Sequence, residues 1–254
     1  MTTALARPAT RPVVHAARRM LQTFAAPMAF FWAILLVAVV VITASLAATG
    51  HGGVSVVSFG RQAGIWFPFS MHVVIATGYF RFHVATGMTR RTFWRASLVV
   101  AAAIAVLNGT LMATLLLVER LVHGWLGWGW VLQDAALDPS GGSWPTMLLD
   151  YGMTYLVANL SGLLVGIVYY ALGSAWGSVA GGWWATLLLP LTAGPVFVVL
   201  GLVASVEGPW PDRLTAYILP SVGSAAAATF GMALLMAVAF ALVARRTAVA
   251  RPRG

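Results

Sequence analysis

Six long apolar stretches constrain the fold of this chain more than any other feature of its sequence. An α-helix rises about 1.5 Å per residue, so about 20 apolar residues are needed to cross the roughly 30 Å hydrocarbon layer of a bilayer. The stretches that reach this length are about 27–48, 65–87, 96–118, 150–172, 182–204 and 217–244. Backbone polar groups inside a bilayer must be satisfied within the protein, and the alternating pattern of a β-barrel is missing. We therefore expect six transmembrane helices.

The composition supports the same class. Hydrophobic residues make up 60% of the chain and charged residues only 8%, whereas soluble domains typically carry about 25% charged residues. We predict an all-α polytopic membrane protein with a basic N-terminal segment (1–26), a single six-helix transmembrane domain (27–244) and a basic tail (245–254). The chain has no cysteine, which excludes disulfides, cysteine-ligated zinc and thiol chemistry.

Charge is distributed asymmetrically between the two sides of the predicted membrane domain. Twelve of the fifteen basic residues fall on one side: Arg7, Arg11, Arg18, Arg19, Arg81, Arg90, Arg91, Arg95, Arg245, Arg246, Arg251 and Arg253. The other side holds the acidic residues Glu119, Asp134, Asp138, Asp150, Glu207 and Asp212, with Arg61, Arg120 and Arg213. The positive-inside rule then places both termini in the cytoplasm. The net charge of +9 is thus a topology signal, and nucleic acid is not an expected partner.

The segment RPVVHAARRMLQTF (11–24) predicts an amphipathic helix before the first span. Val14, Ala17, Leu21 and Phe24 form one stripe with arginines opposite, so the helix is expected to lie along the inner leaflet. For residues 1–10 a disordered basic tail is an equal alternative. On the outer side, the Trp-, Gly- and Pro-containing segments 119–149 and 205–224 are candidates for short re-entrant helices.

Few polar residues lie inside the predicted spans. His72 is interpreted as a packed or pore-lining group, and Asn108 and Asn159 as interhelical hydrogen-bonding groups first and substrate contacts second. These three are the candidate substrate path. Glu119 and Asp150 are expected at the outer ends of their helices, so no carboxylate is expected at membrane depth, which argues against an ion-coupled carrier.

The sequence contains no HExxH, GxSxG or paired-aspartate pattern, and no cofactor, metal or catalytic residue is predicted on this chain. Gly162 and Gly166 form a GxxxG row. Such rows allow close helix approach, either within the chain, which is the default, or at a dimer face.

The densest internal charge lies in the turn after the second span, VATGMTRRTFWRA (84–96). One interpretation is an anchor, with arginines at phosphate level and aromatic rings in the interface. The pattern is more particular, however. The turn lies directly between two spans and resembles the corresponding turn in the permease subunits of type-2 ATP-binding-cassette (ABC) exporters. The matching residues are Gly87, Met88, Thr89, Arg90, Arg91 and Phe93. The six spans fit the same family, and the segment VERLVHGWLGWG (118–129) is similar to actinobacterial members of it. The inner turn 171–182 differs from the family, because it lacks the basic residue that relatives often carry there.

This resemblance implies that the turn is a short coupling helix that docks on a cytoplasmic ATPase. Thr89 would cap it, Arg90, Arg91 and Arg95 would contact acidic residues, and Phe93 or Trp94 would enter an apolar pocket of the partner. Gly87 completes the set of ATPase-coupling residues.

The function expected from the resemblance is that of a bacterial plasma-membrane permease subunit that exports an amphipathic or lipid-like molecule, such as an antibiotic, peptide or lipid. ATP and Mg²⁺ would bind a separate ATPase subunit, because this chain has no GxxxxGK[ST] loop; the chain itself would not be an enzyme. A second permease subunit, identical or related, and the lipid bilayer are the other expected partners. The alternative is a non-transporting integral membrane protein that binds or stabilises a partner.

Overall fold

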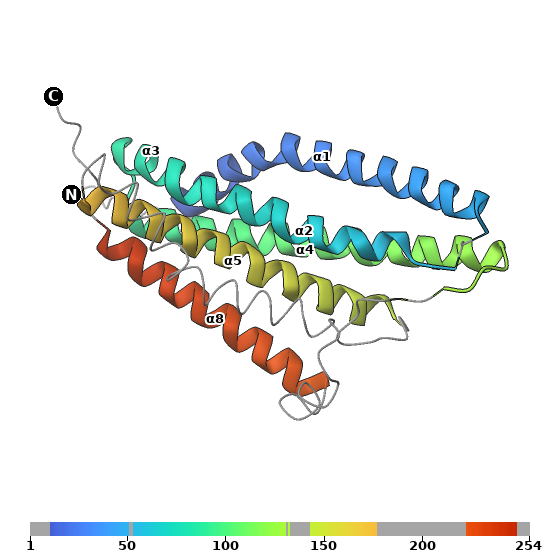
Figure 1. Cartoon of the computed structure of the whole chain (residues 1–254). Helices are drawn as coiled ribbons and strands as arrows, with labels where there is room; N and C mark the ends of the chain where they lie inside the picture. The colour runs from blue at the N-terminus through green and yellow to red at the C-terminus, as the bar shows by residue number, and fades with distance from the viewer. Residues whose placement is uncertain (1–10, 51–52, 131, 133–142, 177–221, 248–254) are drawn as a thin grey trace, which may run out of the picture.

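The computed structural model describes residues 11–50, 53–130, 132, 143–176 and 222–247, and the regular structure in them is entirely helical. The elements are α1 (Arg11–Ala48), α2 (Val56–Val74), the π-helical turn η1 (Ile75–Tyr79), α3 (Phe80–Ala85), α4 (Arg90–Trp125), α5 (Trp144–Trp176) and α8 (Val222–Arg246) (Figure 1). Among the described residues, five helical segments are long and apolar enough to span a membrane: Pro12–Ala48, Val56–Ala85, Arg90–Trp125, Trp144–Ala171 and Thr229–Arg246. The predicted span 182–204, the start of the span 217–244, the segment 205–221 and residues 1–10 lie outside the described residues.

The helices extend beyond the apolar runs that predicted them. Helix α2 begins at Val56 rather than near residue 65, because Ser55 caps it by accepting a hydrogen bond from the Ser58 amide. Helix α5 begins at Trp144 rather than near residue 150. A helix continues until its backbone is capped or broken, and an apolar run marks only its part inside lipid. As a result Arg61 and Asp150 lie within helices.

The glycine row of α5 packs against the chain's own second span. A Cβ atom added to Gly162 would collide with the Phe69 carbonyl oxygen, and one added to Gly166 would lie 2.6 Å from the Val73 carbonyl oxygen. Helices α4 and α5 also come close, since a Cβ on Gly109 would lie 2.8 Å from the Cα of Gly152. The prediction of close packing within the chain is confirmed for Gly162 and Gly166. Figure 1 shows α5 between the α2–α4 layer and α8.

The second span contains a π-helical turn, η1, where α5 approaches it. Thr77 Oγ1 donates hydrogen bonds to the Val73 and Val74 carbonyl oxygens at 2.9 and 3.2 Å. The widened turn faces Gly166, because a Cβ there would also lie 2.7 Å from the Ala76 Cβ. The π-turn and the glycine are thus parts of one helix contact.

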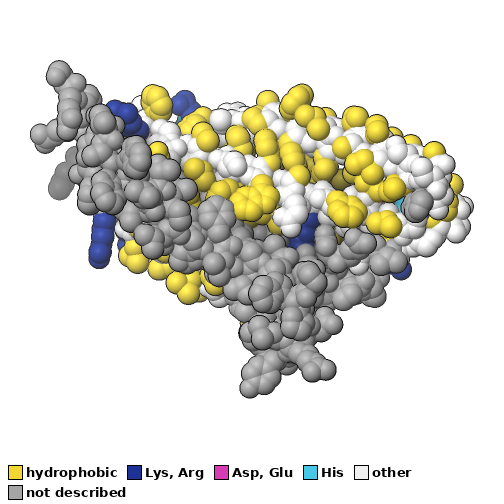
Figure 2. Space-filling model, in the orientation of Figure 1, with side chains coloured by type: hydrophobic (Ala, Val, Ile, Leu, Met, Phe, Trp, Pro, Cys, Tyr) yellow, Lys and Arg dark blue, Asp and Glu magenta, His cyan; other side chains and the backbone are white. Residues whose placement is uncertain are grey.

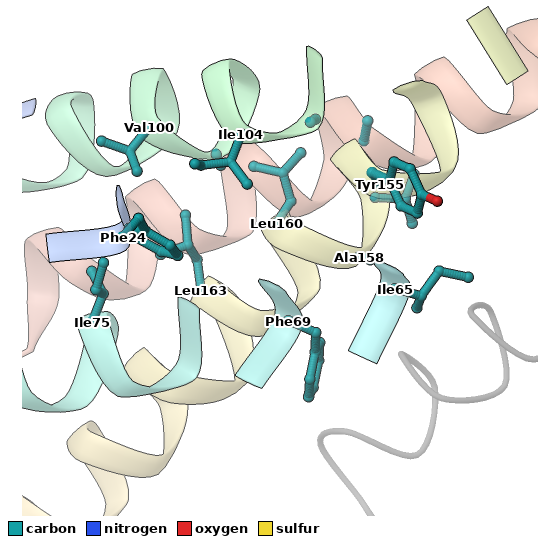
Figure 3. Packing of buried hydrophobic residues seen from close by; sticks show 14 of the residues in the cluster. Phe24, Ile65, Phe69, Ile75, Val100, Ile104, Tyr155, Ala158, Leu160 and Leu163 are labelled. Carbon is teal, nitrogen blue, oxygen red and sulfur yellow. The ribbon is translucent and has the colours of Figure 1, made fainter. Parts of the chain in front are cut away.

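Helix α1 joins the predicted amphipathic helix and the first span into one element, with Pro27 inside it. Its buried stripe runs through Ala16, Met20 and Phe24, and Val14 is 64% exposed. Met20 Sδ lies 4.0 Å from Ser97 Oγ of α4, and the Phe24 ring lies 4.9 Å from His72. The buried side of the amphipathic stripe therefore faces the bundle, and its position relative to the inner leaflet stays a prediction. Figure 3 shows Phe24 within the apolar core beside Ile75 and Leu163.

An aromatic cluster fixes the direction of α8. The Phe80 ring lies 5.1 Å from Phe93 and 5.2 Å from Tyr170, and Phe93 lies 6.4 Å from Phe240. Earlier in both helices, Ser161 Oγ of α5 lies 3.1 Å from Met236 Sδ of α8. The later residues of α5 and of α8 therefore lie at the same end of the bundle, and these two helices run in the same direction.

Candidate functional site

Basic side chains gather at the end of the bundle where α4 begins and α8 ends (Figures 1 and 2). Arg90 Nη1 donates a hydrogen bond to the Arg245 carbonyl oxygen at 3.1 Å. The guanidinium groups of Arg245 and Arg95 lie 5.1 and 5.4 Å from the centre of the Trp94 ring. Carbonyls at a helix C-terminus attract cations, so Arg90 stabilises the end of α8. We call this surface, made of Arg90, Arg91, Trp94, Arg95 and Arg245, the arginine end.

The turn that leads into this surface has the predicted cap. Gly87 has a φ of +80°, a left-handed conformation that glycine adopts without strain. Thr89 Oγ1 accepts a hydrogen bond from the Thr92 amide at 3.1 Å, which confirms Thr89 as an N-cap. Helix α4 then continues for 36 residues. The expectation of a separate short coupling helix is wrong for this chain, because residues 91–108 contain no Gly or Pro that would end the helix early.

The side chains of the turn divide between packing and exposure. Phe93 is completely buried, with its ring against Phe80, His83 and Phe240. It belongs to the chain's own core, which leaves Trp94 as the ring of the predicted pair that could enter a partner's pocket. Arg91 is exposed, whereas Arg90, Trp94 and Arg95 are half-buried. Gly87 and Thr89 are also exposed, so the turn and Arg91 are accessible to a partner.

The three candidate path residues are all buried and bonded within the bundle. Asn108 Oδ1 accepts a hydrogen bond from Trp32 Nε1 at 3.0 Å, which joins α4 to α1. Asn159 Nδ2 donates to the Ala101 carbonyl oxygen at 3.0 Å, which joins α5 to α4. His72 Nδ1 lies 2.7 Å from the Pro68 carbonyl oxygen of its own helix. The interhelical role is confirmed for both asparagines.

A buried polar layer between α2 and α5 escaped the sequence analysis. Arg61 is 1% exposed; its Nη2 donates to Thr154 Oγ1 at 3.3 Å, and its guanidinium lies 5.4 Å from the Tyr151 ring. Asp150 is 5% exposed, and Tyr155 is fully buried on the same helix. The expectation that Arg61 lies in an outer segment is wrong, and Asp150 is buried inside α5. We call Arg61, Asp150, Tyr151, Thr154 and Tyr155 the polar layer.

Local capping signals could have placed these residues. Ser55 and Ser58 precede Arg61 in the arrangement of a helix N-cap. Ser143 Oγ accepts from the Thr146 amide at 3.4 Å, and Pro145 is the second residue of α5, where proline is tolerated. Both signals start the helices early enough to include Arg61 and Asp150.

Glu119 of α4 caps the N-terminus of α2, the helix that carries Arg61. Its Oε1 accepts hydrogen bonds from the backbone amides of Val56 and Val57 at 2.7 and 2.9 Å, and its Oε2 accepts from Ser55 Oγ and from Trp130 Nε1. A carboxylate at a helix N-terminus is favoured by the free amides and the helix dipole. Glu119 therefore fixes the start of α2 to the end of α4.

Within the described part of the chain, no three His, Asp or Glu side chains come together in a way that could hold a metal ion. Comparison with known proteins assigns no family: no family model, curated protein or solved structure matches this chain. The function has to be argued from the arginine end and the polar layer.

Proposed function

We propose that this chain is the membrane-spanning permease subunit of an ABC exporter, and that its arginine end docks on a separate cytoplasmic ATPase subunit. The observation that carries the proposal is the arginine end itself. A capped helix start presents the exposed Arg91 on a base that Arg90, Trp94 and Arg245 stiffen. A guanidinium held in this way loses little conformational freedom on pairing with a carboxylate of a partner.

The direction of α5 and α8 supports a sixth span. Two successive described helices that run in the same direction need a connection that returns along the bundle, and the apolar stretch 182–204 is long enough to provide it. With six spans the start of α1 and the end of α8 share one side. The arginines of that side put it in the cytoplasm of a bacterial cell, where the ATPase would hold ATP and Mg²⁺.

The proposed cargo is an amphipathic or lipid-like molecule, and a second permease subunit, identical or related, completes the path. The exposed surface of the described spans is apolar over long stretches, including Phe30, Ile34, Val37 and Val41 of α1, which suits contact with lipid. The proposal keeps Arg91 as the principal coupling residue and gives Arg90 and Phe93 structural roles.

The test compares Arg91→Glu with Arg120→Glu. Both residues are exposed arginines of α4, but Arg120 lies near the opposite end of that helix. The permease is purified from its native host with a tag, and the co-purifying protein that has a P-loop and hydrolyses ATP is quantified. Arg91→Glu should weaken its association at least about 30-fold, because a favourable charge pair becomes a repulsive one. Arg120→Glu should leave the association unchanged.

Equal ATPase recovery with Arg91→Glu, at normal membrane expression, would contradict the docking surface. Absence of any such ATPase from the wild-type preparation, with another protein bound in its place, would favour a non-transporting partner-binding protein.

A further inference from the structure

We infer that Arg61 is the receptor for an oxyanion, the phosphate or carboxylate head of an amphiphile, which binds in the polar layer between α2 and α5. This inference rests on the proposed function, because it names the chemical class of the cargo. Its first support is the cost of the arginine. A guanidinium buried in a transmembrane segment is expensive, and such residues are found where they bind ions or substrates.

Packing alone does not require a charge at this place. Helices α2 and α5 already meet through Gly162 and Gly166, and elsewhere the bundle is joined by neutral bonds such as Trp32–Asn108 and Asn159–Ala101. A buried ion pair is often no more stabilising than apolar residues of the same size. Stability therefore gives no reason for Arg61.

The second support is a donor aimed into the layer. The Tyr155 hydroxyl is fully buried and has no hydrogen-bond partner among the described residues. It faces α2 beside Gly64, since a Cβ on Gly64 would lie 2.7 Å from the hydroxyl oxygen. Gly64 follows Arg61 by three residues on α2, so the two positions lie on neighbouring parts of one face. Figure 3 shows the hydroxyl directed away from the labelled apolar side chains.

These groups select the class of ligand. A guanidinium has only donors and forms paired hydrogen bonds with phosphate or carboxylate. The hydroxyls of Tyr155 and Thr154 can donate to the same oxyanion. A cationic head could not accept hydrogen bonds from these donors, and a neutral head would not use the charge of Arg61.

Asp150 allows a bound oxyanion to be exchanged for a carboxylate of the chain itself. It lies one helical turn before Thr154, the residue that Arg61 bonds, so its carboxylate is placed on the same face of α5. An incoming oxyanion competes with that carboxylate for the guanidinium. For an oxyanion to bind, the first turns of α2 have to move away from α5. Cargo binding is therefore coupled to a movement of α2, the helix that Glu119 caps.

The test measures binding to the purified permease in nanodiscs of an uncharged galactolipid, which has no phosphate, without an ATPase, so it does not depend on the docking surface. The probes, kept below their micellar concentrations, are dodecyl phosphate, dodecyl maltoside as a neutral amphiphile with the same chain, and inorganic phosphate. We expect dodecyl phosphate to bind at least about tenfold more tightly than dodecyl maltoside, which corresponds to one charge-assisted contact.

Tyr155→Phe is the most informative variant, because it removes only the hydroxyl. It should weaken dodecyl phosphate binding about tenfold while the melting temperature stays level or rises, since an unpaired buried polar group is lost. Asp150→Asn should tighten binding. The pair Arg61→Gln with Asp150→Asn, which keeps the layer neutral, should weaken it at least about 30-fold. Arg120→Gln, an exposed control, should bind like wild type.

Competition by inorganic phosphate that depends on Arg61 would identify a free anion as a sufficient ligand, and its failure to compete would identify the amphiphile; both results support the receptor. Wild-type dodecyl phosphate binding in both Tyr155→Phe and the Arg61→Gln, Asp150→Asn pair would overturn the inference.

Discussion

Adding one methyl group to α5 tests the contact between Gly166 and the π-turn. In Gly166→Ala the new Cβ would lie 2.6 Å from the Val73 carbonyl oxygen and 2.7 Å from the Ala76 Cβ, so the two backbones must separate. In Gly152→Ala, on the same helix, the new Cβ meets no atom within 4 Å. The two substitutions are chemically identical and differ only in the space available.

The magnitudes follow from two opposing effects. Alanine stabilises a helix relative to glycine by about 0.5–1 kcal/mol, and overpacking a close contact costs about 1–3 kcal/mol. Gly152→Ala should therefore gain about 0.5–1 kcal/mol in free energy of unfolding. Because the propensity gain is common to both variants, Gly166→Ala should be less stable than Gly152→Ala by about 1–3 kcal/mol, the overpacking cost alone.

Equilibrium unfolding in mixed micelles, followed by tryptophan fluorescence, measures the difference directly. Equal free energies of unfolding for the two variants, or a more stable Gly166→Ala, would refute the close approach of α5 to η1. A parallel measurement of helical content shows that neither variant has lost a span.

Two further substitutions test the caps. Glu119→Gln should lower the free energy of unfolding by about 1.5–3 kcal/mol, because the charged acceptor for the Val56 and Val57 amides is replaced by a neutral one. Arg120→Gln next to it should cost at most about 1 kcal/mol, because the exposed guanidinium that it removes contacts the Trp130 ring. Equal melting temperatures for the two variants would contradict the capping role. Thr89→Ala should lower the free energy of unfolding by about 1 kcal/mol, because the Thr92 amide loses its acceptor. Thr89→Ser should keep the wild-type stability, because the serine hydroxyl can accept the same hydrogen bond. A Thr89→Ser variant as unstable as Thr89→Ala would show that the hydroxyl is not the stabilising group.

The helical membrane class, the Thr89 cap and the asparagine bonds could be predicted because each depends on local sequence. Apolar length sets the number of candidate spans, and a Thr before a helical run predicts a cap. An asparagine inside a span needs a polar partner whichever helix provides it, so an interhelical bond was a safe prediction for Asn108 and Asn159.

Two features could not be predicted from local sequence: the surroundings of Phe93 and the groups that contact Arg61. Whether Phe93 faces a partner or its own core depends on Phe80 of α3 and Phe240 of α8, which are far from it in sequence. The charge of Arg61 alone predicts a position outside a span. In the structure its charge is met by groups of α5, ninety residues or more along the chain, and no local pattern announces such a partner.

The π-turn at Ile75–Tyr79 keeps the phase of the second span. Each residue of an α-helix advances the chain by about 100° around the axis, and a π-turn accommodates one residue more than a regular turn. Removing one residue from 75–79 would let the segment relax to a regular α-helix while Phe80–Ala85 keep their direction around the axis, because the π-turn holds its extra residue within one turn. Phe80 would then stay against the rings of Phe93 and Tyr170. Removing one residue from a regular α-helical part of α2 instead would rotate Phe80 by about 100° away from these rings, although the composition of the span would hardly change.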